Sequence, residues 1–291
     1  MSTVPYEIVD VFTDRPFAGN PLAVVFEAEH LAADQMQTLA REFNLAETVF
    51  VLPPTADGAT YRARIFTTET ELPFAGHPSV GAAVTSMRRG LFQAGRVVQE
   101  CGAGLLPIEV TTAGRATLTG GEPRLGDPVT PGPLLDMLGL TASDFAGGDQ
   151  AAARFAGCGL DWLFLPVRRE ALARIRLNAP EAERQGVTDI SVFSWADGEA
   201  HARVFVPGTA VWEDPATGSA ALGLGVWLVA AGWLPPDGTT SYRVHQGVEM
   251  KRPSQLDCTV TAKAGTTTSA TVAGHVHAIA EGKISVPPFI G

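Results

Sequence analysis

The chain has 291 residues, of which 45% are apolar and 18% charged, and 21 basic side chains face 31 acidic ones for a net charge of −10. This length indicates two domains or one large one, and the apolar content excludes an intrinsically disordered chain. The acidic balance argues against a nucleic acid or an anionic membrane as partner, because both require a basic face.

The first half of the chain predicts alternating strands and helices. Apolar residues at helical spacing predict a helix over residues 32–43, with Asn44 as its stop. A second helix is expected over 78–89, because a proline stands in its first turn and Gly90 follows it. Short β-branched or alternating runs predict strands at 7–12, 23–26, 61–66, 96–100, 105–111 and 116–118.

The second half contains a helix that is apolar on every side. It is expected over residues 220–231, and such a helix has to be buried. We therefore expect an α/β (α+β) fold with two pseudo-symmetric lobes, each a curved, mostly antiparallel sheet around a buried helix. Glycine and proline are dense over 119–133, which favours a boundary there. The first lobe is expected at 1–125 and the second at 126–276, and it stays open whether 277–291 crosses back to the first.

An internal repeat supports two homologous lobes. The segment ELPFAGHPSVGAA at 71–83 matches EDPATGSAALGLG at 213–225. Three shorter fragments recur in the same order, namely Phe17-Ala-Gly with Phe155-Ala-Gly, Thr48-Val-Phe with Ser191-Val-Phe, and Arg64-Ile-Phe with Arg203-Val-Phe. The alternative is a chance likeness between segments of small residues.

Two similar lobes are expected to meet across a cleft, which is a usual place for a ligand. The helix starts at Gly76 and Gly218 would offer backbone N–H groups and a positive dipole end to a carboxylate or phosphate. Glycine also lets a ligand approach the backbone closely. The alternative is that both are ordinary tight turns.

Polar residues that occur in only one copy of the repeat are candidates for chemistry. Glu47 falls opposite Ile190, Asp214 opposite Leu72, and His77 opposite Ser219. A carboxylate just ahead of an apolar strand is expected to be partly desolvated, which raises its pKa and suits Glu47 to proton transfer. The alternatives are a solvent-exposed loop position for Glu47, a helix N-cap for Asp214 and a capping partner for His77.

Other motifs in the sequence give weaker evidence of function. His275-Val-His277 places two imidazoles on one strand face, which is how a zinc site can begin, but no third ligand is evident and no metal is expected. Three widely spaced cysteines, Cys101, Cys158 and Cys258, make no disulfide framework and indicate a reducing, cytoplasmic compartment. The N-terminal segment lacks a signal-peptide layout, and the longest apolar run is too short for a membrane span.

Four segments together resemble the PhzF-like isomerase family of phenazine biosynthesis. They are FAGNPLAVV at 17–25, NLAETVF at 44–50, ELPFAGHP at 71–78 and EDPATGSA at 213–220. The resemblance runs from about Val9 to Lys283. It implies a fold similar to that of diaminopimelate epimerase, with two pseudo-symmetric lobes.

The resemblance also implies site residues and a reaction. Glu47 would be the catalytic acid/base, with His77 and Asp214 as its catalytic partners, and Asn20, Gly76, Gly218 and Ser219 would bind the substrate. The reaction would be a cofactor-independent isomerisation that moves a proton between carbons of a small carboxylic acid. A homodimer is implied in the same way.

Some residues depart from the family's usual pattern, namely Thr68, Ala210 and Lys251, and these leave the substrate open. Two other functions also stay open. An epimerase or racemase would need an acid and a base on opposite faces, and the three cysteines lie at none of the site positions, which disfavours a two-cysteine racemase. A non-catalytic protein that binds small acids would use the same residues.

Overall fold

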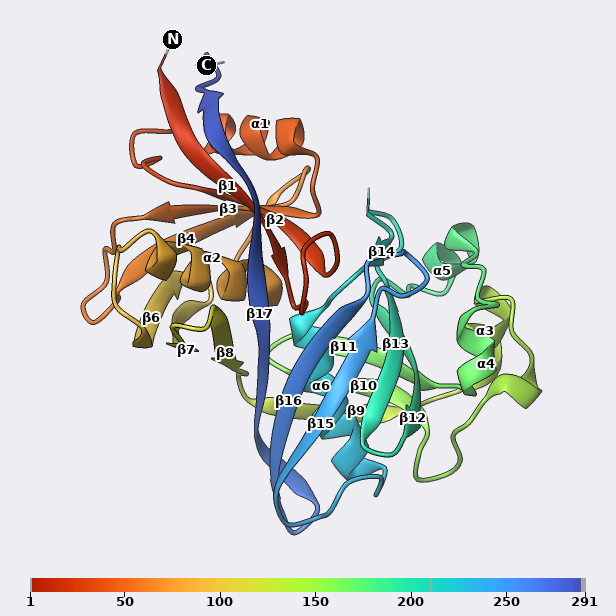
Figure 1. Cartoon of the computed structure of the whole chain (residues 1–291). Helices are drawn as coiled ribbons and strands as arrows, with labels where there is room; N and C mark the ends of the chain where they lie inside the picture. Colours follow the sequence, from red (N-terminus) through yellow and green to blue (C-terminus); the bar gives the residue numbers. More distant parts are fainter. Residues whose placement is uncertain (1, 210, 289–291) are drawn as a thin grey trace. The chain divides into compact units, whose positions relative to one another are not determined.

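A computed structural model describes residues 2–209 and 211–288, so Ala210 lies outside the described residues. The chain divides into two compact units, Met1–Thr119 with Ala273–Gly291, and Gly120–Val272. Strand β17 (Thr266–Ser285), dark blue in Figure 1, begins in the second unit and ends in the first. Both units mix strands and helices, as the α+β prediction requires.

The first unit places strands around one central helix, α2 (Gly76–Arg88), which contacts β1 to β4 and β6 to β8 (Figure 1). A second helix, α1 (Ala33–Phe43), buries Met36, Leu39 and Ala40 along one face and ends at Asn44, which has a left-handed φ of 51°. The strands are β1 (Thr3–Val11), β2 (Asn20–Val25), β3 (Glu47–Leu52), β4 (Tyr61–Phe66), β5 (Glu71–Leu72), β6 (Gly95–Cys101), β7 (Gly104–Val110) and β8 (Arg115–Thr119).

The second unit is built around α6 (Gly218–Ala230), which contacts β9, β10, β11 and β16. Its strands are β9 (Pro123–Val129), β10 (Ala153–Cys158), β11 (Asp161–Pro166), β12 (Ile190–Ala196), β13 (Glu199–Phe205), β14 (Glu213–Asp214), β15 (Gly238–Gln246) and β16 (Ser254–Lys263). Its shorter helices are α3 (Pro131–Met137), the 3-10 turn η1 (Ala142–Asp144), α4 (Arg169–Leu172) and α5 (Ala179–Arg184).

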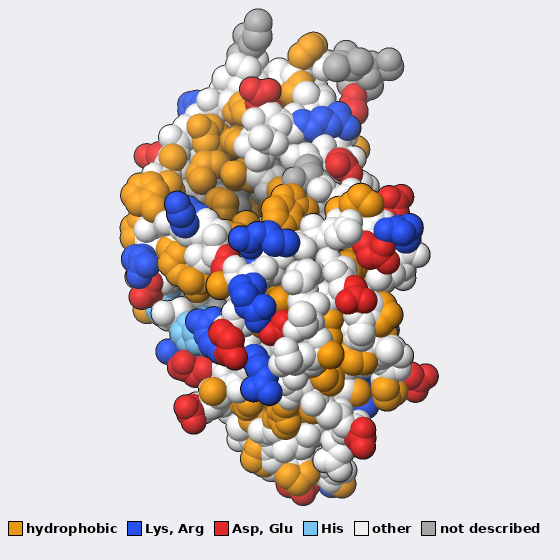
Figure 2. Space-filling model, turned by 90° about the vertical axis from the view of Figure 1, so that its right-hand side faces the viewer, with side chains coloured by type: hydrophobic (Ala, Val, Ile, Leu, Met, Phe, Trp, Pro, Cys, Tyr) orange, Lys and Arg blue, Asp and Glu red, His pale blue; other side chains and the backbone are white. Residues whose placement is uncertain are grey.

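Helix α6 is buried from Gly218 to Val229, as its all-round apolar sequence predicts. In the described part of the chain, no helix is both long enough and apolar enough to cross a membrane. On the face that Figure 2 shows, basic and acidic side chains lie interspersed with apolar ones rather than segregated by sign.

The two units repeat the same strand pairings. In the first, β1–β2 is antiparallel, β2–β3 parallel, β3–β4 and β4–β5 antiparallel, and β4–β6 parallel. In the second, β10–β11, β11–β12, β12–β13, β13–β14 and β13–β15 follow in the same senses. This repetition confirms the pseudo-symmetric fold that the sequence predicts.

The register of these pairs places the polar residues as the repeat predicted. Leu22 lies opposite Glu47, and Leu163 lies opposite Ile190, so Glu47 and Ile190 are equivalent. In the same way the pair of Ile65 with Leu72 corresponds to the pair of Val204 with Asp214.

A glycine in each central helix allows close contact with strands. A Cβ on Gly81 of α2 would lie 2.4 Å from Leu22 Cδ2 and 3.0 Å from Val11 Cγ2. A Cβ on Gly223 of α6 would lie 2.9 Å from the carbonyl oxygen of Ala156. Both glycines therefore serve helix-to-strand packing.

One prediction about local structure is wrong. Phe17 lies in the loop between β1 and β2, whereas Phe155 lies within β10, so their Phe-Ala-Gly fragments are not equivalent. The cause is a longer connection in the first unit, since a tight turn joins β10 to β11. The stretch 119–133, where a boundary between lobes is expected, includes the division at Thr119/Gly120 and also contains β9, which pairs with β10. Pro123 opens this strand, a position that tolerates proline, and Pro128 lies within it, opposite Arg154.

Candidate active site

Three predicted polar residues meet in the first unit. Glu47 is the first residue of β3, Asn20 is the first residue of the parallel neighbour β2, and His77 is the second residue of α2. His77 Nε2 lies 3.5 Å from Glu47 Oε2. On the other side of the ring, Asn20 Nδ2 lies 3.2 Å from His77 Nδ1. The fold thus brings three separate segments to one polar group.

The surroundings of His77 fix its charge and its tautomer. Burial lowers the pKa of His77 to about 3, so the ring is neutral at ordinary pH. An amide nitrogen can only donate, so Nδ1 accepts from Asn20 and the ring proton sits on Nε2. That N–H faces the Glu47 carboxylate. Glu47 therefore has a neutral hydrogen-bond donor beside it.

Glu47 is shielded from solvent. Its side chain is 18% exposed and that of His77 is 5% exposed. The alternative of a solvent-exposed loop residue is therefore wrong. A carboxylate that is mostly withdrawn from water and lies beside a polarised N–H is equipped to take up and return a proton.

The start of α2 has the layout of an anion site. Gly76 is its first residue, and the N-cap position is Ala75, with φ −150° and ψ 140°. The N-cap residue Ala75 makes no side-chain cap bond, and Pro78 has no N–H, so Gly76 and His77 supply the N–H groups of this start that lack a side-chain cap. The turn is fixed from behind, because Ser79 Oγ donates to the carbonyl of Ala75 and accepts from Gln99 Nε2.

In the second unit, Asp214 belongs to a compact polar group. Thr217 Oγ1 donates to Asp214 Oδ2 at 2.5 Å, and Gln246 Nε2 donates to the Asp214 carbonyl at 2.6 Å and to Thr217 Oγ1 at 2.9 Å. Asp214 lies in β14, and Thr217 holds the N-cap position of α6. The interpretation of Asp214 as a helix N-cap is therefore wrong. The Thr217 hydroxyl is turned toward Asp214 and does not cap the helix.

Ser219 is the second residue of α6, as His77 is of α2. Its hydroxyl oxygen accepts from Trp162 Nε1 at 3.0 Å, and both groups are buried. Trp162 lies at the start of β11, the equivalent of β2, which holds Asn20. In both units, a residue at the start of a strand thus contacts the second residue of the central helix. The contact joins Asn20 to His77 in the first unit and Trp162 to Ser219 in the second.

An arginine–glutamate pair anchors the strand before each central helix. Arg64 binds Glu71 through two hydrogen bonds of 2.7 Å. Arg203 binds Glu213 through bonds of 2.8 and 2.7 Å, and it also donates to the carbonyl of Leu172. These bidentate pairs hold β5 against β4 and β14 against β13, which sets where α2 and α6 begin.

The family model for phenazine biosynthesis-like proteins, PhzC-PhzF, matches residues 9–282. The chain belongs to this family.

Relatives agree with that assignment. An uncharacterized isomerase of Mesorhizobium japonicum is 35% identical, over 98% of this chain and 100% of the relative. The trans-2,3-dihydro-3-hydroxyanthranilate isomerase of Pseudomonas aeruginosa is 32% identical, over 96% of this chain and 98% of the relative. A solved structure of a PhzF-family phenazine biosynthesis protein from Bacillus anthracis matches with a TM-score of 0.87 and 25% identity, covering 98% and 100% of the two chains. This protein is an isomerase of the PhzF family.

In this PhzF-family isomerase the predicted site residues fall into two groups. The first unit holds Asn20, Glu47, Gly76 and His77, and the second holds Asp214, Gly218 and Ser219. The neighbours that orient them, Trp162, Thr217 and Gln246, could not be identified from the sequence pattern. Aligning strand starts instead of the Phe-Ala-Gly fragments would have placed Trp162 beside the position equivalent to Asn20. Gln246 carries no signal of its own, since it contacts Asp214 from 32 positions away.

Proposed function

We propose that this PhzF-family isomerase moves a proton between two carbons of a small carboxylic acid without a cofactor, and that Glu47 carries the proton. The observation that supports this most is the 3.5 Å approach of the neutral His77 ring to the shielded Glu47 carboxylate. A neutral partner leaves the carboxylate free to cycle between its two protonation states, whereas a cation would hold it ionised.

The reaction needs one acid/base group. Glu47 removes a proton from a carbon that a conjugated double bond has made acidic, and the electron pair of the broken C–H bond spreads over the conjugated system. The Glu47 carboxyl group, whose acidic hydrogen exchanges with solvent between the two steps, then protonates another carbon of the same system, so the double bonds shift and the composition of the substrate is unchanged. The base of the first step is the acid of the second. The dipole of the His77 Nε2–H, 3.5 Å from Glu47 Oε2, stabilises the carboxylate form electrostatically.

The open helix starts supply the binding energy in this proposal. The N–H groups of Gly76 and His77 at the start of α2 would bind the substrate carboxylate. In the second unit, Ser219 accepts from Trp162, so its own proton can be donated to a substrate oxygen. Asp214 has the acceptor capacity to bind a hydroxyl or amino group in addition to Thr217. We propose that Gly218, Ser219 and Asp214 are substrate-binding residues of the second unit.

The proposed substrate class is a small unsaturated acid that carries a hydroxyl or amino group. The Pseudomonas aeruginosa relative is named for trans-2,3-dihydro-3-hydroxyanthranilate, a compound of this class. A cytoplasmic location and a homodimer stay predictions for this chain, and sedimentation of the purified protein tests the latter.

The test is proton NMR of the tag-free protein in deuterated water with a panel of such acids, trans-2,3-dihydro-3-hydroxyanthranilate included. We expect deuterium at a new carbon of the product, together with a shifted double bond. Deuterium at a single stereocentre with inversion would replace the proposal by an epimerase. Binding without exchange for every compound that binds would replace it by a binding protein.

A further inference from the structure

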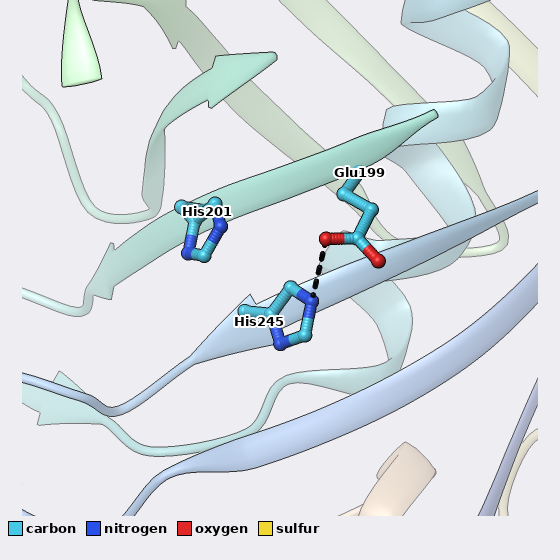
Figure 3. A group of neighbouring side chains, drawn as sticks. All are labelled: Glu199, His201 and His245. Atoms are coloured by element: carbon cyan, nitrogen blue, oxygen red, sulfur yellow. Dashed lines mark hydrogen bonds and ion pairs between the residues drawn. The ribbon is translucent and has the colours of Figure 1, made fainter. Parts of the chain in front are cut away.

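A second group of polar side chains lies in the second unit, on the neighbouring parallel strands β13 and β15. His201 of β13 lies directly opposite His245 of β15. Side chains two residues apart on a strand share a face, so Glu199 projects on the same side as His201. Figure 3 shows the three side chains gathered from the two strands. These three residues take no part in the proposed isomerisation.

The donor atoms of this group are close together. Glu199, His201 and His245 each offer one ligand atom, and these atoms all lie within 4.8 Å of one another. His245 Nε2 lies 3.2 Å from Glu199 Oε2. Zinc bonds of about 2 Å in a tetrahedral site separate donor atoms by roughly 3.3 Å, so this pair already has the spacing that zinc requires.

His201 adds a buried donor. Its Nδ1 is buried and has no hydrogen-bond partner among the described residues. The two imidazole rings stack with centroids 4.7 Å apart and planes 17° apart, so a rotation of the side chains is needed to turn both nitrogens toward one ion. Two imidazoles and one carboxylate are the ligand set of open, three-ligand zinc sites.

Charges of both signs surround the group. Burial, with the nearby charge of Arg169, lowers the pKa of His201 to about 4. Arg169 opposes a cation as it opposes the protonated ring, while the negative charge of Glu199 acts in the other direction.

A cavity adjoins the group. Its volume is about 710 Å³, and Glu199, His201, Arg168, Arg169, Trp195 and Trp233 are among the residues that line it. A fourth coordination position that faces this cavity is accessible to a small molecule. Arg168 and Arg169 can donate to an anion there, while Asp197 places a carboxylate on the same lining.

We propose that Glu199, His201 and His245 form a site for a divalent transition metal, zinc first, whose fourth ligand is water or a small anion in the adjoining cavity. The site does not depend on the proposed isomerisation. It uses neither histidine of the His275-Val-His277 pair, the motif that the sequence analysis considered for zinc.

The test is titration of tag-free, chelator-treated protein with Zn²⁺ by calorimetry, and with Co²⁺ by visible absorption. We expect one ion per chain and the intense absorption of a four-coordinate cobalt site. His201→Ala and His245→Ala should each weaken zinc binding by about 10-fold or more. The matched control is the double variant His275→Ala/His277→Ala, which should bind as the wild type does.

Glu199→Gln provides a variant with little risk to folding, since the Glu199 side chain is 48% exposed. It should also weaken zinc binding while circular dichroism stays unchanged. Zinc binding that survives in His201→Ala and His245→Ala, or that is lost in the His275/His277 control, would overturn the proposal. No zinc binding by the wild type would do the same.

Discussion

His77 presents its Nε2 to Glu47 Oε2 at 3.5 Å, and this pair joins the start of the central helix of the first unit to the start of β3. The carboxylate of Glu47 faces an N–H only in the His77 tautomer that is protonated on Nε2. The amide of Asn20 favours this tautomer, because it donates to Nδ1 on the other side of the ring. The first three predictions concern this pair and the framework that holds the helix starts.

Asn20→Asp should disturb the tautomer of His77. A carboxylate accepts only, so it draws the ring proton to Nδ1 or charges the ring, and either change alters the donor that faces Glu47. We expect turnover to fall by about 10-fold or more, with a changed ¹⁵N signal of the His77 side chain. Asn178→Asp is the control, because Asn178 is a helix N-cap where aspartate serves equally well. An unchanged tautomer with an unchanged rate would contradict the role of Asn20.

His77 should also make the protein sensitive to acid. Its pKa is about 3 in the folded state against 6.5 as the ordinary value, so the unfolded chain binds more protons between these pH values. The free energy of unfolding therefore falls as the pH drops through this window, by at most about 1.4 kcal/mol per pH unit. Urea unfolding of His77→Gln at several pH values should show a shallower dependence. His275→Gln, at an exposed position, should retain the wild-type slope, and equal slopes for both variants would refute the account.

The two arginine–glutamate pairs should differ in their contribution to stability. The side chains of Arg203 and Glu213 are 8% and 7% exposed, whereas those of Arg64 and Glu71 are 25% and 42% exposed. Glu213→Gln leaves a buried guanidinium without its counter-charge and should cost about 3 kcal/mol. Glu71→Gln should cost about 1 kcal/mol or less. Denaturant unfolding measures both, and equal losses would contradict the burial argument.

The central helices should resist an added methyl group. In Gly223→Ala the new Cβ meets a backbone carbonyl at 2.9 Å, and we expect a loss of about 2 kcal/mol. Gly81→Ala should cost less, because the nearest atom is the flexible end of Leu22. Gly132→Ala in α3 is the control, since nothing lies within 4 Å of its Cβ and alanine favours helix. Thermal unfolding ranks the three variants by stability. A Gly223→Ala variant that is as stable as the wild type would refute the packing argument.

Local chemistry explains how much of the fold could be predicted. The helix expected at 78–89 is α2 at Gly76–Arg88, because a first-turn proline and a following glycine mark its ends. The strand at 61–66 is β4 with the same bounds, because its residues alternate from Tyr61 to Ile65. Strand β9 was missed because proline and glycine read as breakers wherever they stand, and only the pairing with β10 shows that they are tolerated there.

Part of the candidate site could also be predicted from the sequence. Comparing the two halves singled out Glu47, His77 and Asp214, since a repeat exposes residues that packing does not require. It could not give the contact of Asn20 with His77 across 57 positions, which depends on how β2 meets α2. The group of Glu199, His201 and His245 was invisible for the same reason, because the parallel pairing of β13 with β15 creates it.

The most direct test of the central claim is the rate of deuterium incorporation in Glu47→Gln, measured by NMR with whichever acid the wild type turns over. The account predicts a loss of at least about 100-fold, the size expected when a general acid/base is removed, with substrate binding retained. Glu42→Gln, an exposed position on α1, should exchange at the wild-type rate. Exchange in Glu47→Gln within a few-fold of the wild type would show that another group moves the proton.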